Sequence, residues 1–329
     1  MKRILRAVFL VLVLSDATVG VGHAQQEAGG WPGKPVKLLV PFTLGGATDI
    51  VARILAPALG EVLGQPFVVE NRPGAAGNIG VEVVVRSQPD GLTVLVGNIS
   101  TNAINPTGFA KSLKFDAVRD LTGVTLIASI PTVLVAGVQL PPNNFKELIE
   151  YARARPGELN YSNPIGAYSH FDTLELSTRT GIQVVHVPSK GAGTAVTPLL
   201  TGEIHFSFLT TASVMPYVKG GRLKAYATTS AQRLLELPDV PTMAEVGFPG
   251  VGSVNWNGFF LPVRTPRVIV NKLHAATLRV MQRPQVRDAF ANSFVPITPS
   301  KSPEEFQAFV QAEAARWARI VKDHNVRLE

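Results

Sequence analysis

The stretch "LLVPFTLGGATDIVARILAPAL", Leu38–Leu59, joins two kinds of local structure. Apolar residues lead into Pro41, Gly45 and Gly46 follow, and a helical pattern begins near Thr48. A strand, a Gly-Gly turn and a helix N-terminus bring several unpaired backbone N–H groups to one place. Such donors favour a carboxylate or another hydrogen-bond acceptor as their partner.

Two polar residues at the start of this helix each allow two interpretations. Thr48 can cap the helix or present its hydroxyl to a ligand. Asp49 can complement the helix dipole from the first turn, or orient water or a donor group in a pocket. The residues alone leave both pairs of alternatives open.

Outward from this stretch, strand-like and helix-like segments alternate. The last helix carries a capping signal, with Ser302 before Pro303 and Glu305 in the first turn. The alternation predicts α/β sheets with helices on both faces. Strands are predicted over 36–40, 67–70, 93–96, 124–129, 184–187 and 204–209, and helices over 48–63, 78–86, 144–155, 169–180 and 192–201, before two long closing helices.

Two segments have the character of crossings between domains. Residues 124–130 lead outward and residues 257–262 lead back. We therefore predict a discontinuous first domain, residues 25–126 with 255–329, and a second domain at 127–254.

The first residues have the pattern of a secretory signal peptide. Three basic residues precede an apolar run at 7–14, and Gly22 and Ala24 suit cleavage after Ala24. The run is far shorter than the ~20 residues that a membrane-spanning helix needs. We predict that residues 1–24 are a signal peptide and that the protein is exported.

The composition narrows the classes of function. Of 329 residues, 46% are hydrophobic and 17% are charged, and the net charge of +7 falls to +5 without residues 1–24. The basic residues are dispersed rather than clustered with aromatics, which argues against nucleic acid as a partner. The chain has no cysteine, so its stability must come from core burial rather than disulfides.

A second glycine-rich stretch, "VENRPGAAGNIG" at Val69–Gly80, differs from a dinucleotide fingerprint. Its spacing is GxxGxxG rather than GxGxxG, and no acid stands about 20 residues further on to hold a ribose. We expect no nucleotide, no other cofactor and no metal ion.

Five stretches together resemble one family. They resemble, in order and rough spacing, the TctC-like or Bug family, the periplasmic solute-binding proteins of tripartite tricarboxylate transporters. The resemblance extends from Trp31 to the C-terminus. The stretches are "VPFTLGGATDIVAR", "GQPFVVENRPGAAGNIG", "PDGLTVLVGN", "HVPSKGAGTA" and "LPDVPTMAEVGFPG".

This resemblance implies a type II periplasmic binding protein, a Venus flytrap of two α/β domains joined by a hinge. It implies that the domains close on a small organic acid in the periplasm and deliver it to a membrane permease of the tripartite tricarboxylate type. We expect a monomer.

The resemblance also implies a site. It favours the ligand-binding interpretation of Asp49, which in the family grips a ligand carboxylate through ordered water. In the second domain, "YSNPIGAYSH" matches the family at Tyr161, Gly166 and His170. The expected ligand-binding residues are Phe42, Thr43, Leu44, Gly45, Gly46, Thr48 and Asp49 in the first domain, and Asn163, Ile165, Gly166, Ala167, Tyr168, His170, Ser189 and Leu209 in the second.

Several second-domain positions depart from the family pattern toward apolar character. Ala167 stands where a hydroxyl is expected, Tyr168 adds bulk, and Ser189 replaces a common aromatic. Leu209 and Pro198 stand where acids are common. Because a few polar groups on an apolar wall set ligand specificity, we predict a carboxylate with a more apolar or aromatic remainder.

Two other functions are alternatives to solute binding for transport. A ligand-sensing partner of a two-component histidine kinase would use the same domain closure. A hydrolytic enzyme would need a positioned nucleophile and base, but the chain has no GxSxG, HExxH or P-loop motif. Ser169, His170 and Asp172 are triad residue types, yet adjacency in sequence does not form a triad. We interpret His170 as a loop or helix-start residue that bonds to backbone, and expect no enzyme.

Overall fold

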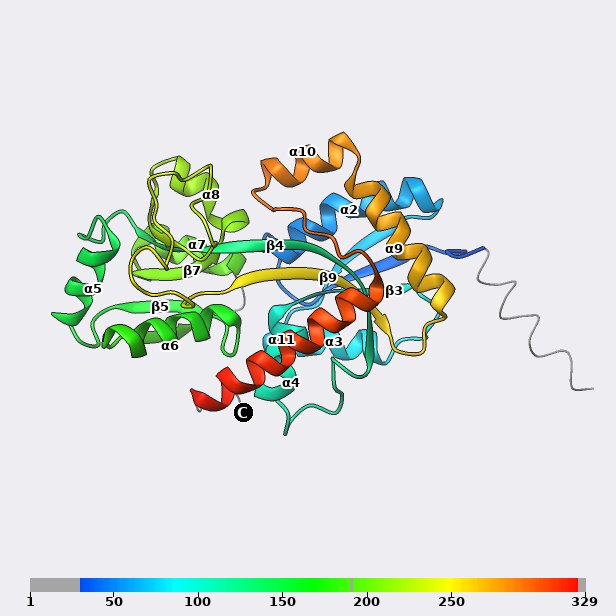
Figure 1. The fold of residues 1–329 in the computed structure, drawn as a ribbon, viewed down its shortest axis with the longest axis horizontal. Helices are drawn as coiled ribbons and strands as arrows, with labels where there is room; N and C mark the ends of the chain where they lie inside the picture. The colour runs from blue at the N-terminus through cyan, green and yellow to red at the C-terminus, as the bar shows by residue number, and fades with distance from the viewer. Residues whose placement is uncertain (1–29, 190–191, 325–329) are drawn as a thin grey trace, which may run out of the picture.

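The computed structural model describes residues 30–189 and 192–324, so the expected signal peptide lies outside the described residues. Within these residues the strands form one nine-stranded mixed sheet in the order β2-β1-β3-β9-β4-β7-β5-β6, with β8 paired to β4 (Figure 1). The strands are β1 (Val36–Val40), β2 (Phe67–Asn71), β3 (Thr93–Asn98), β4 (Leu121–Gly137), β5 (Asn160–Asn163), β6 (Val185–Pro188), β7 (Phe206–Thr210), β8 (Leu223–Thr228) and β9 (Val254–Pro262).

Helices cover both faces of the sheet in each half of the molecule (Figure 1). The α-helices are α2 (Ala47–Leu63), α3 (Asn78–Val85), α4 (Asn105–Gly108), α5 (Phe145–Arg153), α6 (Tyr168–Thr180), α7 (Ala192–Thr201), α8 (Thr211–Lys219), α9 (Arg267–Met281), α10 (Pro284–Asn292) and α11 (Pro303–Asp323), with the short turns η1 (Ala75–Gly77) and η2 (Ser100–Ile104) between them.

Two long strands join the halves. β4 pairs with β9 from Leu121 to Pro131 and with β7 and β8 from Thr132 to Gly137. In Figure 1, β4 and β9 run side by side from one half toward the other. The protein therefore has two α/β domains connected through these strands, as in a Venus flytrap. The exact domain boundaries stay a prediction. The partner of β4 changes from β9 to β7 at Thr132, a few residues beyond the predicted border at residue 126.

Most of the predicted elements are present, with three kinds of difference. The strand expected over 124–129 is the inner part of the longer β4. The strands β5 and β8 and the helices α4 and α8 were not predicted, because each is short. Residues 257–262 of β9 were predicted only as a crossing between domains. The chain closes with three helices rather than two, since Pro284 begins a separate helix, α10, at its first turn.

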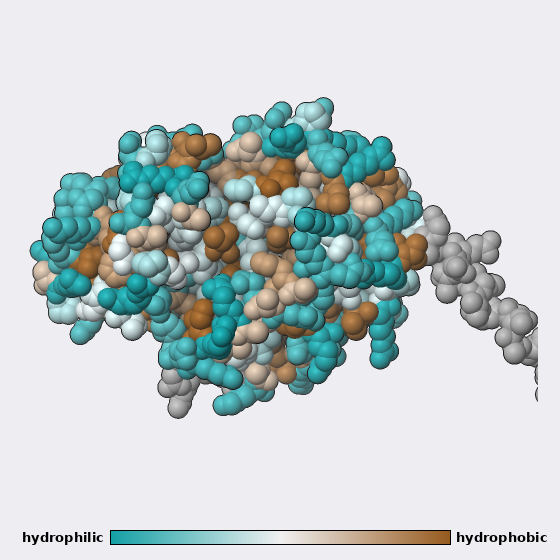
Figure 2. Space-filling view, viewed as in Figure 1, coloured by the Kyte–Doolittle hydropathy of each residue, from teal (hydrophilic) through white to brown (hydrophobic). Residues whose placement is uncertain are grey.

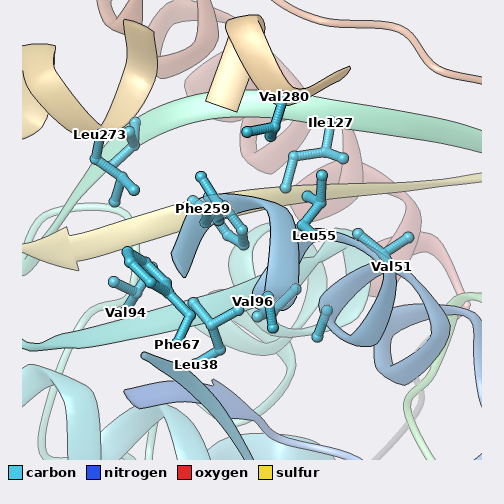
Figure 3. Packing of buried hydrophobic residues seen from close by; sticks show 14 of the residues in the cluster. Leu38, Val51, Leu55, Phe67, Val94, Val96, Ile127, Phe259, Leu273 and Val280 are labelled. Atoms are coloured by element: carbon cyan, nitrogen blue, oxygen red, sulfur yellow. The ribbon is translucent and has the colours of Figure 1, made fainter. Parts of the chain in front are cut away.

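The first domain buries one face of its sheet under α2 and α9. Figure 3 shows Val51 and Leu55 of α2 in one cluster with Val96 and Phe259 of the sheet and Leu273 of α9. Burial of a side chain of this size contributes ~1.5–3 kcal/mol. Since α2 is fixed along its whole length, its N-terminus is held directly after β1.

The closing helix α11 begins as the sequence predicts. The Ser302 hydroxyl accepts a 3.1 Å hydrogen bond from the Glu305 N–H, which confirms the capping signal. At its other end, His324 lies 3.1 Å from the Glu175 carboxylate of α6. Thus α11 extends from the first domain to the second.

The surface is mixed in character. Figure 2 shows hydrophilic residues over most of the visible face, with hydrophobic residues in separate patches. Within the described ranges, every helix is too short or too polar to cross a membrane.

Candidate functional site

The carboxyl ends of the parallel strands in the two domains face one another. β1 and β3 are parallel in the first domain, and β5 and β7 are parallel in the second. Ligands of α/β proteins bind at such ends. A small cavity of about 50 Å³ lies here. It is lined by Phe42, Thr43, Gly46, Ala47 and Thr48 after β1, by Asn98 at the end of β3 and Ser100 after it, by Asn163 at the end of β5 and Pro164, Ala167, Tyr168 and Ser169 after it, by Leu209 and Thr210 of β7, and by Asn255 of β9.

Three helices start at this cavity. The residues that precede α2, α6 and α8 are Gly46, Ala167 and Thr210, and none of these three side chains caps its helix. The first-turn N–H groups of a helix and its dipole attract negative charge. Among the described residues that line the cavity, none is lysine or arginine. Backbone N–H groups and helix dipoles therefore supply the positive potential of this site.

Thr48 lies at the centre of a buried hydrogen-bond network. Its hydroxyl oxygen is 3.5 Å from the Asn98 side-chain nitrogen and 3.4 Å from that of Asn257. Both amides are donors, so the hydroxyl accepts from them and keeps its own proton to donate. Gly46 is the N-cap of α2, which excludes the capping interpretation of Thr48. The remaining interpretation, a hydroxyl offered to a ligand, fits its place on the cavity wall.

Asp49 lies behind the loop rather than on the cavity wall. Its carboxylate accepts hydrogen bonds from the Gly45 N–H at 3.0 Å, from Arg53 Nε at 3.0 Å and from Asn71 Nδ2 at 2.9 Å. Burial acts to raise the pKa of Asp49, but the bonds from Arg53, Gly45 and Asn71 outweigh it and lower that pKa. Asp49 thus fixes the loop as an anion. Its expected contact with a ligand through water stays a prediction.

In the second domain, His170 holds the loop before α6. Its Nδ1 accepts a 3.2 Å hydrogen bond from the Gly166 N–H, and its ring stacks on His186 at 4.2 Å. Burial, with His186 beside it, lowers the pKa of His170 to about 4. The imidazole is therefore neutral at pH 7. Its Nδ1 carries no proton and can accept the hydrogen bond from Gly166. This bond confirms the interpretation of His170 as a residue that bonds to backbone.

The three triad residue types have separate partners. His170 binds Gly166, whereas the Asp172 carboxylate accepts from the Ser253 N–H at 3.1 Å and from its hydroxyl at 2.6 Å. The Ser169 carbonyl accepts from Asn163. These contacts leave no Ser–His–Asp relay among these residues. Across the described ranges, no group of three or more His, Asp or Glu residues is arranged to hold a metal ion.

The structure brings together part of the predicted site. Tyr168 reaches the cavity but also packs in an apolar cluster with Ile99 and Trp256 of the first domain, and its burial raises the pKa of its hydroxyl. Leu44 is 63% exposed and lines no described cavity. The predicted residues on the cavity wall are Phe42, Thr43, Gly46, Thr48, Asn163, Ala167, Tyr168 and Leu209. Asp49, Gly166 and His170 are buried behind it, Gly45 is exposed outside it, and Ile165 and Ser189 line an adjoining groove.

Several polar residues of the site were missed by the sequence analysis. Asn98 ends β3 and Ser100 follows it, and Asn255 and Asn257 lie on β9, where residues two apart share one face. The Thr43 hydroxyl and the Asn255 Oδ1 are buried and make no hydrogen bond within the described protein. Because an unpaired buried polar group costs ~1–3 kcal/mol, both atoms favour a polar ligand in the cavity. The asparagines in the otherwise apolar strands β3 and β9 could have indicated these positions from the sequence.

Comparison with known proteins gives consistent matches. The model of the tripartite tricarboxylate transporter family receptor matches residues 51–326. Protein BugT of Bordetella pertussis is 33% identical over 321 residues, which are 97% of this chain and 98% of BugT.

Solved structures resemble the whole fold. The structure of Rpa4515 from R. palustris with adipate has a TM-score of 0.85 and 33% identity, and the match covers 90% of this chain and 98% of that one. MatC (Rpa3494) from Rhodopseudomonas palustris, with bound malate, has a TM-score of 0.84 and 32% identity, with 88% and 100% covered.

Proposed function

The chain belongs to the tripartite tricarboxylate transporter receptor family, the TctC-like Bug proteins, and on that premise we propose that it captures a small organic carboxylate between its two domains. The family consists of periplasmic solute-binding proteins. The carboxylate lies at the cavity between the ends of β1, β3, β5 and β7. The protein holds this ligand without transforming it.

One observation carries the proposal. The N-termini of α2, α6 and α8 meet at a cavity whose described wall contains no basic side chain. Three partly positive helix ends favour an anion, and the backbone N–H groups offer it directed hydrogen bonds. The Thr48 proton is a further donor at the same place. A planar carboxylate, with four acceptor positions, suits this set of donors.

The relatives support a carboxylate over other anions. Two structures with about one third of their residues identical to this chain hold adipate and malate. For this chain we propose the cavity wall listed above as the binding residues, with Asp49, Gly45, Gly166 and His170 as residues that position its loops.

We further propose that the protein acts in the periplasm, reached through a signal peptide at residues 1–24, and delivers its ligand to a tripartite tricarboxylate-type permease. Family membership supports this partner. Ligand-driven closure would present the permease with a surface that the open form lacks.

Calorimetric titration tests the proposal. A panel of short carboxylates and their uncharged amides is titrated into the purified protein, and binding of acids but not of the matching amides is expected. Thr48→Val removes one donor to a charged group, worth ~1.5–3 kcal/mol, and should weaken the acids about tenfold or more. Thr122→Val in β4, which lies outside the cavity, is the control. Equal binding of acids and amides would overturn the proposal.

A further inference from the structure

A second, larger hollow adjoins the carboxylate cavity. It has a volume of about 530 Å³ and lies between the segments after β1 and β2 in the first domain and those after β5 and β6 in the second. Phe42 of the first domain and Pro164 of the second line both hollows. The two hollows therefore adjoin at these two side chains, and we call the larger one the apolar groove.

The wall of the apolar groove is mainly apolar. None of the described residues that line it is charged, and most are proline, alanine, glycine or phenylalanine. Ile165 is 43% exposed and lines the groove but not the carboxylate cavity. The Ser189 hydroxyl is a buried polar atom without a partner in the described protein. The groove thus offers mainly apolar contact, together with the Ser189 hydroxyl and polar backbone groups such as those of residues 74–77.

A glycine allows the groove to take this shape. Gly77 has φ +94°, and a Cβ there would lie 3.3 Å from Phe42 Cζ and 2.7 Å from Thr101 Cγ2. Glycine therefore lets the β2–α3 segment approach the Phe42 ring closely. The ring is held between the two hollows as part of the wall of each.

The sizes and walls of the hollows together define a class of ligand. The carboxylate cavity holds little more than the acid group, so the rest of the ligand must occupy the groove. A second ionised carboxylate there would lose part of its hydration and, among the described residues, would meet one helix start, that of α3 after Gly77, instead of the three at the carboxylate cavity. Its desolvation would therefore be less well compensated. An alkyl chain or an aromatic ring would gain from leaving water.

We propose that the ligand is a monocarboxylate with an aliphatic or aromatic tail, and that the apolar groove selects it over dicarboxylates. This inference rests on the proposed function, because the groove matters only if a carboxylate occupies the adjoining cavity. It distinguishes this chain from the relatives whose structures hold the diacids adipate and malate.

Matched acids test the inference by calorimetry on the purified protein. Propionate, butyrate and hexanoate form a series in chain length, and adipate has the six carbons of hexanoate with a carboxylate in place of the terminal methyl group. Affinity should rise about fourfold for each methylene, which corresponds to ~0.8 kcal/mol. Adipate should bind at least tenfold more weakly than hexanoate. Equal affinity along the series, or adipate as tight as hexanoate, would overturn the inference.

Two variants show whether the groove itself is responsible. Ile165→Ser should weaken hexanoate several-fold and leave propionate unchanged, because only the longer chain reaches that side chain. Val138→Ser is the matched control, since Val138 is 48% exposed and lies in the turn after β4, outside both hollows. An equal loss of hexanoate affinity in Ile165→Ser and Val138→Ser would contradict the role of the groove. So would an equal loss of hexanoate and propionate affinity in Ile165→Ser.

The result also separates the two proposals. If no acid of the series binds, the proposed function itself is wrong and this inference falls with it. If propionate binds but a longer tail gives no advantage, carboxylate binding stands and only the role of the groove is wrong.

Discussion

The backbone N–H of Tyr168 donates a 3.3 Å hydrogen bond to the Ser100 hydroxyl oxygen. Tyr168 is the first residue of α6 in the second domain, and Ser100 is the first residue of η2 in the first. Both residues line the carboxylate cavity. The N-terminus of α6, which forms part of the carboxylate cavity, therefore also contacts the first domain. This hydrogen bond links the geometry of the cavity to the contact between the two domains.

Removal of the Ser100 hydroxyl should weaken this contact. In Ser100→Ala the Tyr168 N–H loses its partner, and a net hydrogen bond is worth ~0.5–1.5 kcal/mol. We expect carboxylate affinity, measured by calorimetry, to fall about three- to tenfold. Ser87→Ala is the control, because the Ser87 hydroxyl donates to Val84 within the first domain. A similar fall in both variants would mean that the contact between domains does not contribute.

Asp49 should affect binding although it lies behind the cavity. Asp49→Ala leaves the Gly45 N–H, Arg53 and Asn71 without their common acceptor. The loop before α2 should loosen, with carboxylate affinity lowered about tenfold and stability lowered by ~1–3 kcal/mol in chemical denaturation. Glu82→Ala removes an exposed ion pair with Arg86 and should cost under ~1 kcal/mol. Unchanged affinity in Asp49→Ala would disprove the positioning role.

His170 should be needed as a neutral acceptor. His170→Phe keeps a ring near His186 but leaves the Gly166 N–H without a partner, at ~1–3 kcal/mol of stability. His205→Phe is a matched control, because His205 Nδ1 likewise accepts a backbone N–H, that of Asn160, away from the cavity. Both variants should be less stable, but only His170→Phe should bind carboxylates more weakly. Equal binding in the two would contradict this assignment.

His170 also predicts an acid limit of stability. In the folded protein the pKa of His170 is about 4, below the ordinary value of 6.5. As the pH falls, the unfolded chain therefore takes up a proton on this ring before the folded protein does. The stability contributed by the neutral ring is complete above pH 6.5 and is lost as the pH falls toward 4. Denaturation at pH 7 and pH 4.5 should show a larger loss in the wild type than in His170→Phe. Parallel pH profiles would exclude His170 as a source of acid sensitivity.

Asp172 should have the opposite pH dependence. Burial raises its pKa to about 7, although the two bonds from Ser253 and the charge of Arg316 act to lower it. The native state thus keeps a proton that the unfolded chain has already released above pH 4, and stability falls as the pH rises from 4 to 7. The cavity beside Asp172 also contains Glu175, Arg316, Asp323 and His324.

Comparison with Asp172→Asn measures this effect. The stability of the wild type relative to this variant should be greater at pH 5 than at pH 8, by roughly 2 kcal/mol. Chemical denaturation at both pH values gives the difference. A constant difference would show that Asp172 keeps one protonation state throughout that range.

The sequence by itself determined much of the fold. The strand, turn and helix around Gly45 and Gly46, the capping signal at Ser302 and the β–α alternation are local patterns, and each depends on residues close together in the chain. The crossing segments at 124–130 and 257–262 indicated two domains, and the family resemblance added their Venus-flytrap arrangement and the class of ligand. The predicted residues at positions 42–48 largely line the cavity, because a turn between a strand and a helix has few ways to place its atoms.

Only the tertiary structure decided which polar groups complete the site and what Asp49 and Tyr168 do. Thr48 meets Asn257 across 209 positions of sequence, and Tyr168 of the second domain packs with Trp256 in an apolar cluster of the first. Asp49 turns to Gly45, Arg53 and Asn71, which satisfy its charge away from the cavity. Such contacts arise when sheets and helices pack, so the burial of distant segments against one another sets them, and no local pattern specifies them.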